Sequence, residues 1–180
     1  AFLLLDEIGI DIGVKVAAIM EKAYAPRFVA SDALKRAGEN GKALGRKTGK
    51  GFYIHEGKRR VNPAMRRLLA TQASRSRKPH GDNDILYRCM CMFLGELVRV
   101  MDEGIITDAG YIDLAFVTGA GFPAFRGGPL KWADTTGIPH LVEIFEGLAS
   151  RYGEKYIPPE RLKRMAEEGR TFHSGEKSDE

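Results

Sequence analysis

In two glycine-rich stretches, the spacing of the glycines resembles that of loops that bind the phosphates of a nucleotide. Gly119-Ala-Gly-Phe-Pro-Ala124 fits the loose dinucleotide fingerprint, which needs a strand before it and a helix N-terminus after it. Here a predicted helix comes first and Pro123 removes an amide donor, so we interpret the stretch as a turn between helices. Gly41-Lys-Ala-Leu-Gly-Arg-Lys-Thr48 has three residues between its glycines, whereas a phosphate loop requires four. Neither stretch is therefore predicted to bind a nucleotide.

A third stretch, Gly45-Arg-Lys-Thr-Gly-Lys-Gly-Phe-Tyr53, combines three glycines with three basic residues. Its positive charge could attract the phosphates of a coenzyme, because glycines let the backbone approach a ligand closely. The alternative is a closing turn that Phe52 and Tyr53 anchor on neighbouring helices. We favour the structural interpretation and keep the functional one open.

The histidines and cysteines are the remaining candidates for catalysis or metal binding. His55, His80, His140 and His173 lack metal-ligand spacing, and we expect them at the surface or at helix caps. Cys89 and Cys91 lie two positions apart on a predicted helix, a spacing that suits neither a disulfide nor a zinc site. We expect two reduced, partly buried thiols in a reducing compartment, with no metal bound.

Composition indicates an ordinary globular protein of 180 residues, with 43% hydrophobic and 29% charged residues. No apolar run reaches the length of a membrane span. The net charge is +4, and eight basic residues without an acidic one lie between Gly57 and His80: Lys58, Arg59, Arg60, Arg66, Arg67, Arg75, Arg77 and Lys78. Such a block can bind nucleic acid, a membrane surface or an anionic ligand. No aromatic residue is interleaved for base stacking, so we favour a solvated helix and linker and no nucleic-acid partner.

Helix signals dominate the elements that must position these residues. Apolar residues recur at three to four positions from Leu86 to Val100, after a predicted cap at Asp84 and before a stop at Gly104. Further helices are predicted after Thr107 or Asp108, from Pro129 to Trp132, after Pro139, from Pro159 to Gly169, over 32–40 with Ser31 as cap, and from Asn62 to about Ala73. Only Gly51 to His55 is expected to be extended. The fold class is therefore predicted as all-α.

An internal repeat organises the chain. An ungapped alignment of residues 6–42 with residues 134–170 pairs Asp6 with Asp134 and contains ten identities. We predict a duplicated helical unit, with the first copy over 1–73, a linker over 74–83 and the second copy over 84–180. The chain starts without Met, and the first copy has no counterpart of residues 84–127, so we expect a first copy truncated within a longer protein.

Four segments together resemble the C-terminal domains of 3-hydroxyacyl-CoA dehydrogenases: Leu4-Leu-Asp-Glu-Ile-Gly-Ile-Asp11, the stretch Gly45 to Tyr53, Asp102-Glu-Gly-Ile105, and Gly119 to Pro129 followed by Trp132 and Asp134. The tandem copy is similar to the α-subunit of the multifunctional fatty-acid oxidation complex. The resemblance implies tandem helical domains from an enzyme that oxidises L-3-hydroxyacyl-CoA with NAD. It also implies that a histidine base and its glutamate lie in a separate Rossmann domain, so no catalytic or cofactor-binding residue is assigned here.

The resemblance implies that the helical domains cover the acyl-CoA, and that the second copy replaces a dimer partner. A substrate-contacting asparagine of the family corresponds to Tyr87 in the second copy, which departs from the pattern. A substrate-contacting position just before the second Gly-x-Gly-Phe-Pro falls on Thr118, the candidate substrate-binding residue. Implied partners are acyl-CoA, enoyl-CoA hydratase and dehydrogenase regions of the same polypeptide, a thiolase subunit and a second copy, in the bacterial cytoplasm. The alternative function is a non-catalytic helical module for oligomerisation or interaction.

Overall fold

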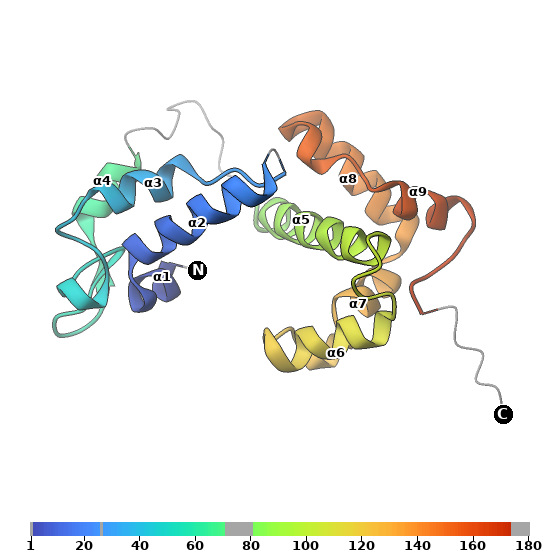
Figure 1. Cartoon of the computed structure of the whole chain (residues 1–180), viewed down its shortest axis with the longest axis horizontal. Helices are drawn as coiled ribbons and strands as arrows, with labels where there is room; N and C mark the ends of the chain where they lie inside the picture. The colour runs from blue at the N-terminus through green and yellow to red at the C-terminus, as the bar shows by residue number, and fades with distance from the viewer. Residues whose placement is uncertain (1, 26, 71–80, 174–180) are drawn as a thin grey trace. The chain divides into compact units, whose positions relative to one another are not determined.

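The computed structural model describes residues 2–25, 27–70 and 81–173 and divides the chain into two compact units, Ala1–Lys78 and Pro79–Glu180 (Figure 1). Within these ranges the fold is all-α apart from one two-stranded hairpin, as predicted. Residues 74–80 of the predicted linker lie outside the described ranges. Each unit encloses a hydrophobic core of its own.

The first unit contains four helices and the hairpin in its described part: α1 (Phe2–Ile8), α2 (Ile10–Tyr24), α3 (Asp32–Glu39), β1 (Tyr53–Ile54), β2 (Arg60–Val61) and α4 (Pro63–Ala70). Its core is built from Ile10, Ala37, Ala43, Phe52 and Met65. Of the extended segment predicted over Gly51 to His55, Tyr53 and Ile54 form a strand, and Tyr53 pairs with Val61 in antiparallel register. Neither α1 nor β2 was predicted from the sequence.

The start of α4 follows the sequence signal at Asn62. The Asn62 side-chain oxygen accepts the N–H of Ala64 at 3.0 Å, and its amide group donates to the Gly51 carbonyl at 2.7 Å. Asn62 is only 4% exposed, so it joins the hairpin to the helix inside the unit. The predicted end near Ala73 lies outside the described residues.

The second unit contains α5 (Asp82–Asp102), α6 (Ala109–Gly119), α7 (Pro129–Thr136), α8 (Ile138–Tyr152) and α9 (Glu160–Glu167). Helix α8 packs against α5, α7 and α9 (Figure 1). Fully buried side chains from all four helices form the core between them: Leu94, Val98, Leu130, Leu141, Phe145 and Leu162.

The predicted helix starts are confirmed at Asp108 and wrong at Asp84. The Asp108 carboxylate accepts the N–H of Tyr111 at 2.8 Å and caps α6. Helix α5 begins earlier, at Asp82, with Gly81 at its cap position. The Asp84 carboxylate, already inside the helix, accepts hydrogen bonds from Arg151 at 3.1 Å and Tyr152 at 2.9 Å. Ser31 occupies the cap position of α3 without a side-chain capping bond, and α7 continues past Trp132.

The element bounds agree with the repeat found in the sequence. Helices α2 and α8 each have 15 residues, α3 and α9 each have eight, and all of them start at aligned positions. The aligned glycines before α2 and α8 also share a conformation, with φ 106° and ψ 124° at Gly9 and φ 96° and ψ 119° at Gly137. The duplication itself stays a prediction that these correspondences support.

Candidate functional site

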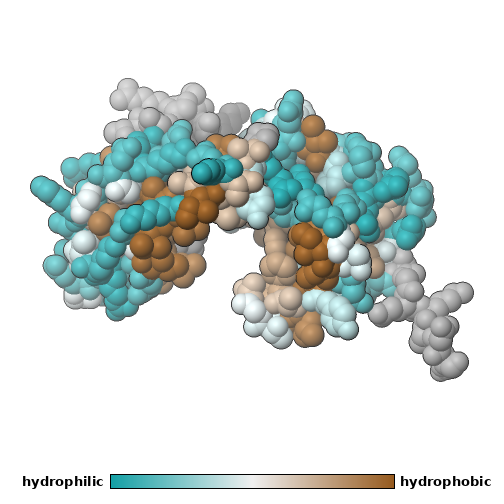
Figure 2. Space-filling model, viewed as in Figure 1, coloured by the Kyte–Doolittle hydropathy of each residue, from teal (hydrophilic) through white to brown (hydrophobic). Residues whose placement is uncertain are grey.

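An apolar groove in the second unit is a candidate for a ligand site. It encloses about 510 Å³ between α5, the end of α6, the turn that follows and α7. Its lining is made of Leu86, Met90, Phe93, Phe116, Ala120, Gly121, Phe122, Pro123, Arg126 and Trp132. Brown, hydrophobic surface is visible on this unit in Figure 2. Since Arg126 is the one charged lining residue, the groove suits an apolar chain with an anionic end.

The turn after α6 shapes one wall of the groove. The amide groups of Ala120 and Phe122 both donate to the Phe116 carbonyl, at 3.2 and 2.9 Å. Gly121 between them has φ 70°, a left-handed conformation that glycine adopts without strain. The Phe116 ring packs edge-on against Phe93 with 4.8 Å between ring centroids, so helices α5 and α6 meet at the groove.

The start of α7, which carries Trp132, is fixed by a buried carboxylate. Asp113 is 4% exposed and accepts the amide hydrogens of Leu130 at 2.7 Å and Lys131 at 2.9 Å. Gly128 comes so close that an added Cβ would lie 2.3 Å from the Asp113 Cβ, and its φ is 121°. Only glycine therefore permits this approach of α6 and α7.

His173 lies between two buried carboxylates of the same unit. Its Nδ1 is 2.8 Å from Asp134 Oδ2, and its Nε2 is 3.2 Å from Asp113 Oδ2. Asp134 also accepts the backbone N–H groups of Phe172 and His173, at 2.8 and 3.1 Å. Because both ring nitrogens already face carboxylates, the ring has no nitrogen left to take a proton from a substrate. This histidine holds the segment after α9 in place.

His55 has the corresponding role in the first unit. Its Nε2 lies 2.8 Å from Asp6 Oδ2, and Asp6 is fully buried. Asp6 also accepts the amide hydrogens of Phe52 at 2.8 Å and Tyr53 at 2.9 Å. The expectation of surface or capping histidines is therefore wrong for His55 and His173, because each pairs with a buried carboxylate.

The two other histidines differ from this pattern. His140 is exposed as expected, with 57% of its side chain accessible. His80 lies outside the described residues. No group of histidine, cysteine and acidic residues suitable for a metal ion occurs in the described ranges.

The basic stretch Gly45–Tyr53 forms the closing turn that we favoured. Arg46 pairs with Glu7 at 2.7 Å and Lys47 pairs with Asp11 at 2.5 Å. The Lys47 hydrogen bond lowers the pKa of Asp11, which keeps that exposed carboxyl ionised beside it. Phe52 is 8% exposed and belongs to the core. Two of the three basic side chains are thus used to hold the turn on α1 and α2.

Thr118, the predicted substrate-binding residue, lies in the last turn of α6 and does not line the groove. Its hydroxyl donates to the Leu114 carbonyl at 2.7 Å, and its side chain is exposed. Tyr87 on α5 is half-buried and packs against the core. A substrate role for Thr118 stays a prediction.

The groove itself was missed by sequence reasoning. Leu86, Met90 and Phe93 belong to the apolar periodicity that predicted their helix, and the structure shows that they line the groove, with Leu86 52% exposed. Helical periodicity shows that these residues share one face of α5 but not whether protein or ligand covers it.

The two cysteines occupy different environments. Cys91 is 1% exposed in the core, and burial raises the pKa of its thiol to about 12. Cys89 is exposed, although partial burial was expected. Both are free thiols, as predicted.

The basic block is solvent-exposed where the structure describes it. Lys58, Arg59, Arg60, Arg66 and Arg67 are all exposed, with the Arg59 guanidinium 5.9 Å from the Tyr53 ring centroid. This agrees with a solvated surface. The remaining basic residues, Arg75, Arg77 and Lys78, lie outside the described part.

The fingerprint-like stretch does not fit a dinucleotide. Gly119 ends a helix rather than a strand, and residues Ala124–Arg126 form a single 3-10 turn instead of a helix N-terminus. The residues of this chain therefore provide no NAD-binding geometry at this stretch.

Of the helices in the described ranges, none has the length and hydropathy to cross a membrane.

Comparison with known sequences agrees with the helical fold described above. The family model described as "3-hydroxyacyl-CoA dehydrogenase, C-terminal domain" matches residues 1–55 and 85–178. The fatty acid oxidation complex subunit alpha of Shewanella halifaxensis is 38% identical over 171 residues, which is 95% of this chain and 24% of that protein. The same subunit of Vibrio parahaemolyticus is 41% identical over 172 residues, with 94% and 24% covered. The chain thus spans about a quarter of these relatives.

Solved structures share the fold at lower identity. The crystal structure of 3-hydroxybutyryl-CoA dehydrogenase from Escherichia coli matches with a TM-score of 0.69 and 18% identity, covering 92% of this chain and 50% of that one. The dehydrogenase part of multifunctional enzyme 1 from C. elegans matches with a TM-score of 0.64 and 24% identity, covering 91% and 38%.

The fold is thus that of a helical dehydrogenase domain without a parallel sheet in its described part. The chain belongs to the 3-hydroxyacyl-CoA dehydrogenase C-terminal domain family. This confirms the resemblance drawn from the motifs Leu4–Asp11, Gly45–Tyr53 and Gly119–Pro129.

Proposed function

We propose that this chain is the substrate-covering and dimer-like assembly part of an NAD-dependent L-3-hydroxyacyl-CoA dehydrogenase of fatty-acid β-oxidation. One observation carries the proposal: relatives described as fatty acid oxidation complex subunit alpha align with 94–95% of this chain but with only 24% of their own length. Hydride transfer and NAD binding then belong to a region outside these 180 residues, and the isolated chain is inactive.

The groove of α5, α6 and α7 suggests how the covering role works. Its aromatic walls at Phe93, Phe116 and Phe122 would take up the apolar acyl part, and Arg126 at its edge would attract an anionic group. Thr118, in the last turn of the same α6 helix, would contact the substrate outside this groove. By excluding water and fixing the geometry of the reacting carbon, such a cover can lower the activation barrier for hydride transfer by roughly several kcal/mol.

The whole protein would act with further partners. We infer enoyl-CoA hydratase and dehydrogenase regions in the same polypeptide, acyl-CoA as substrate and a thiolase subunit, all in the bacterial cytoplasm. The support is the description of the relatives as subunits of a fatty acid oxidation complex.

A chimera tests the proposal. The matching quarter of the Vibrio parahaemolyticus subunit is replaced by residues 1–180, and a second variant lacks that quarter. We expect the chimera to oxidise 3-hydroxyacyl-CoA within about tenfold of the parent, a difference of about 1.4 kcal/mol in barrier. The deletion variant should lose the activity while it still binds NAD. Full activity in the deletion variant would contradict a substrate-covering role.

A second candidate function is a non-catalytic module that assembles with another copy of the chain. It is favoured by the apolar face of α2, where Ile12, Val16, Ile19 and Met20 are 39–68% exposed. Large exposed apolar patches mark interaction sites. Sedimentation equilibrium checks this candidate: a concentration-dependent dimer that Val16→Asp abolishes supports it, and a strict monomer excludes it.

A further inference from the structure

A second apolar pocket lies in the first unit, between α1, the hairpin and α4. It encloses about 340 Å³, which is at the lower end of the range for small-molecule sites. Tyr53 and Val61 are partners across the two strands, so their side chains share one face of the hairpin. The Phe2 and Phe52 rings, whose centroids are 4.7 Å apart, and Leu69 of α4 extend the same lining. Segments distant in sequence thus build one apolar wall.

Much of this wall faces solvent. Phe2 and Val61 are 54% and 55% exposed, and Tyr53 and Leu69 are half-buried. Met65, also in the lining, is buried in the core of the unit. Each Å² of apolar surface removed from water stabilises a complex by about 25 cal/mol. An apolar ligand in the pocket would therefore gain binding free energy by covering these side chains.

A single arginine supplies the charge in the lining. Arg66 lies three residues before Leu69 on α4, so the two side chains are neighbours on the helix surface. The Arg66 side chain is exposed and forms no ion pair with any residue of the described ranges. The stretch from Gly57 to His80 contains no acidic residue that could balance it. The pocket therefore has an apolar wall with an unneutralised positive charge beside it.

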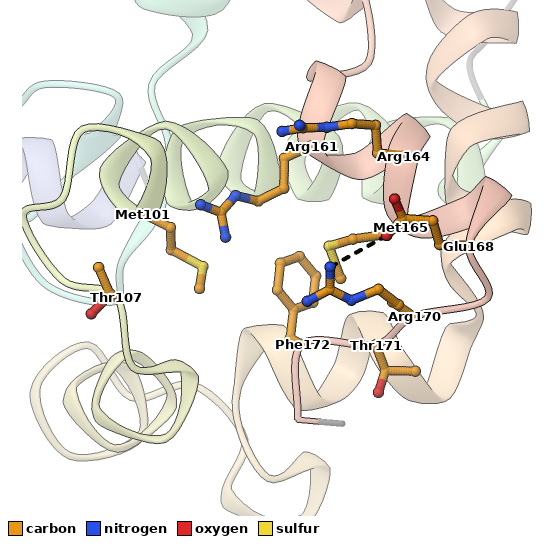
Figure 3. A pocket seen from close by; sticks show the side chains of 9 residues that line it. All are labelled: Met101, Thr107, Arg161, Arg164, Met165, Glu168, Arg170, Thr171 and Phe172. Atoms are coloured by element: carbon orange, nitrogen blue, oxygen red, sulfur yellow. Dashed lines mark hydrogen bonds and ion pairs between the residues drawn. The ribbon is translucent and has the colours of Figure 1, made fainter. Parts of the chain in front are cut away.

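The arginine-lined cavity of the second unit, drawn in Figure 3, lacks this combination. There Arg161 pairs with Asp102, and Arg170 pairs with Glu168 at 3.3 Å, the dashed line in Figure 3. The protein itself thus neutralises two of its arginines, and Met165 is buried beneath a polar surface. Only the pocket of the first unit joins open apolar surface to a cation that the described residues leave unpaired.

The scarcity of hydrogen-bonding groups narrows the choice of ligand. Of the seven lining residues, only Tyr53 and Arg66 carry a polar side-chain group. The amide hydrogens of Phe52 and Tyr53 already bond to Asp6, at 2.8 and 2.9 Å. A peptide in the pocket would bury backbone N–H and C=O groups without partners, which is costly. An alkyl chain has no such groups, so the lining suits a chain that ends in an anion.

We propose that this pocket binds a fatty acid as its carboxylate, with the alkyl chain on Phe2, Val61 and Leu69 and the carboxylate on Arg66. A guanidinium group can donate two parallel hydrogen bonds to a carboxylate. Because Arg66 is exposed, burial of the chain supplies most of the affinity and the ion pair a smaller part. The inference does not rest on the proposed dehydrogenase role, since the pocket lies in the first unit and the groove in the second.

Calorimetric titration of the 180-residue chain with decanoate, hexanoate and acetate tests the proposal. We expect decanoate to bind with a Kd below about 1 mM. Hexanoate, which is four methylene groups shorter, should bind at least about tenfold more weakly, and acetate should not bind measurably. Absence of saturable decanoate binding by the unmodified chain would overturn the proposal. So would binding only to vesicles of anionic phospholipid, because it would indicate a membrane surface instead.

The contribution of the carboxylate is tested by Arg66→Gln, which should weaken decanoate binding about fivefold. The matched control is Arg67→Gln, which removes the same charge from the next residue of α4 but does not line the pocket. It should leave the Kd within about twofold. Equal losses in the two variants would indicate attraction by net charge alone and would overturn the proposal.

A second pair of variants tests whether the chain lies in this pocket. Val61→Asp places a carboxylate in the wall and should weaken decanoate binding at least about tenfold. Its control is Val29→Asp, at an exposed position of the same unit outside the pocket, which should leave the Kd within about twofold. Both sites are exposed, and an unchanged melting temperature establishes that each variant is folded. Decanoate binding that survives Val61→Asp unchanged lies elsewhere in the chain and would overturn the proposal.

Discussion

Three buried carboxylates hold distant segments of this protein together. Asp6, Asp113 and Asp134 are each less than a tenth exposed and each accepts two backbone amide hydrogens from a segment far along the chain. Such charge-assisted bonds are shorter and stronger than neutral ones, and breaking them leaves a buried charge unpaired. These residues therefore have structural roles, and the motif residues Asp6 and Asp134 stabilise the fold rather than take part in the chemistry.

The contact between Gly128 and Asp113 gives a stability prediction. Gly128→Ala should lower the free energy of unfolding of the second unit by about 3 kcal/mol, because its Cβ would overlap Asp113 and its positive φ would be strained. Urea denaturation followed by fluorescence of Trp132, the one tryptophan of the chain, measures this unit directly. The control is Gly147→Ala in the exposed interior of α8, which meets nothing within 4 Å and should stabilise by about 0.5–1 kcal/mol. If the two variants changed the free energy of unfolding equally, the close packing of Gly128 against Asp113 would be contradicted.

The groove gives a prediction about substrate. In the chimera with the Vibrio subunit, Phe122→Ala should raise the KM for a long-chain 3-hydroxyacyl-CoA about tenfold, because it removes one apolar wall. A short-chain substrate should be affected less. Phe125→Ala is the matched control, since Phe125 is 85% exposed and does not line the groove. If both variants behave like the parent toward both substrates, the groove does not bind the acyl chain.

The two thiols should react very differently. Near about pH 8, an alkylating reagent should modify Cys89 quickly, whereas Cys91 stays protonated and buried, because its pKa is raised to about 12. Raising the pH toward that value should ionise Cys91 and speed its reaction. Mass spectrometry should detect one adduct on the native chain and two after denaturation. A rapid native adduct on Cys89→Ser would contradict the burial of Cys91.

At the scale of elements, helix caps show where local signals are sufficient. The carboxylate of Asp108 caps α6, whereas Thr107, the alternative cap, does not. Asp108→Ala should therefore lower the free energy of unfolding of the second unit by about 1 kcal/mol, and Thr107→Ala by about 0.3 kcal/mol. The Trp132 fluorescence transition in urea distinguishes them. A larger loss in the threonine variant would show that the cap is wrongly assigned.

The elements also show what sequence could and could not predict. Glycine and proline residues at helix ends predicted α7, α8 and α9, and the sequence also predicted the extended segment near Tyr53. These predictions succeeded because such local signals act within a few residues. Asp84 is not the cap, since α5 begins at Asp82, and the residues that its carboxylate binds, Arg151 and Tyr152, are too distant in sequence to be predicted as its partners. The buried histidine–aspartate pairs and the groove depend on three-dimensional packing, which periodicity does not encode.

At the scale of the whole molecule, two helical units with separate cores occupy a chain that spans about a quarter of its relatives. Their shared element bounds support duplication of one unit, and the groove lies in the second. Nothing in the described residues provides the strand and helix N-terminus that a dinucleotide needs. These features support the proposed division of labour, in which this part would cover the substrate while another part performs hydride transfer.

The most direct test of this claim is a turnover assay on the isolated chain. Residues 1–180 are mixed with L-3-hydroxybutyryl-CoA and NAD, and NADH is followed by its absorbance, with the full-length Vibrio subunit as positive control. We predict no NADH above background from the chain and rapid formation by the control. NADH formation by the chain alone, proportional to its concentration, would contradict the account.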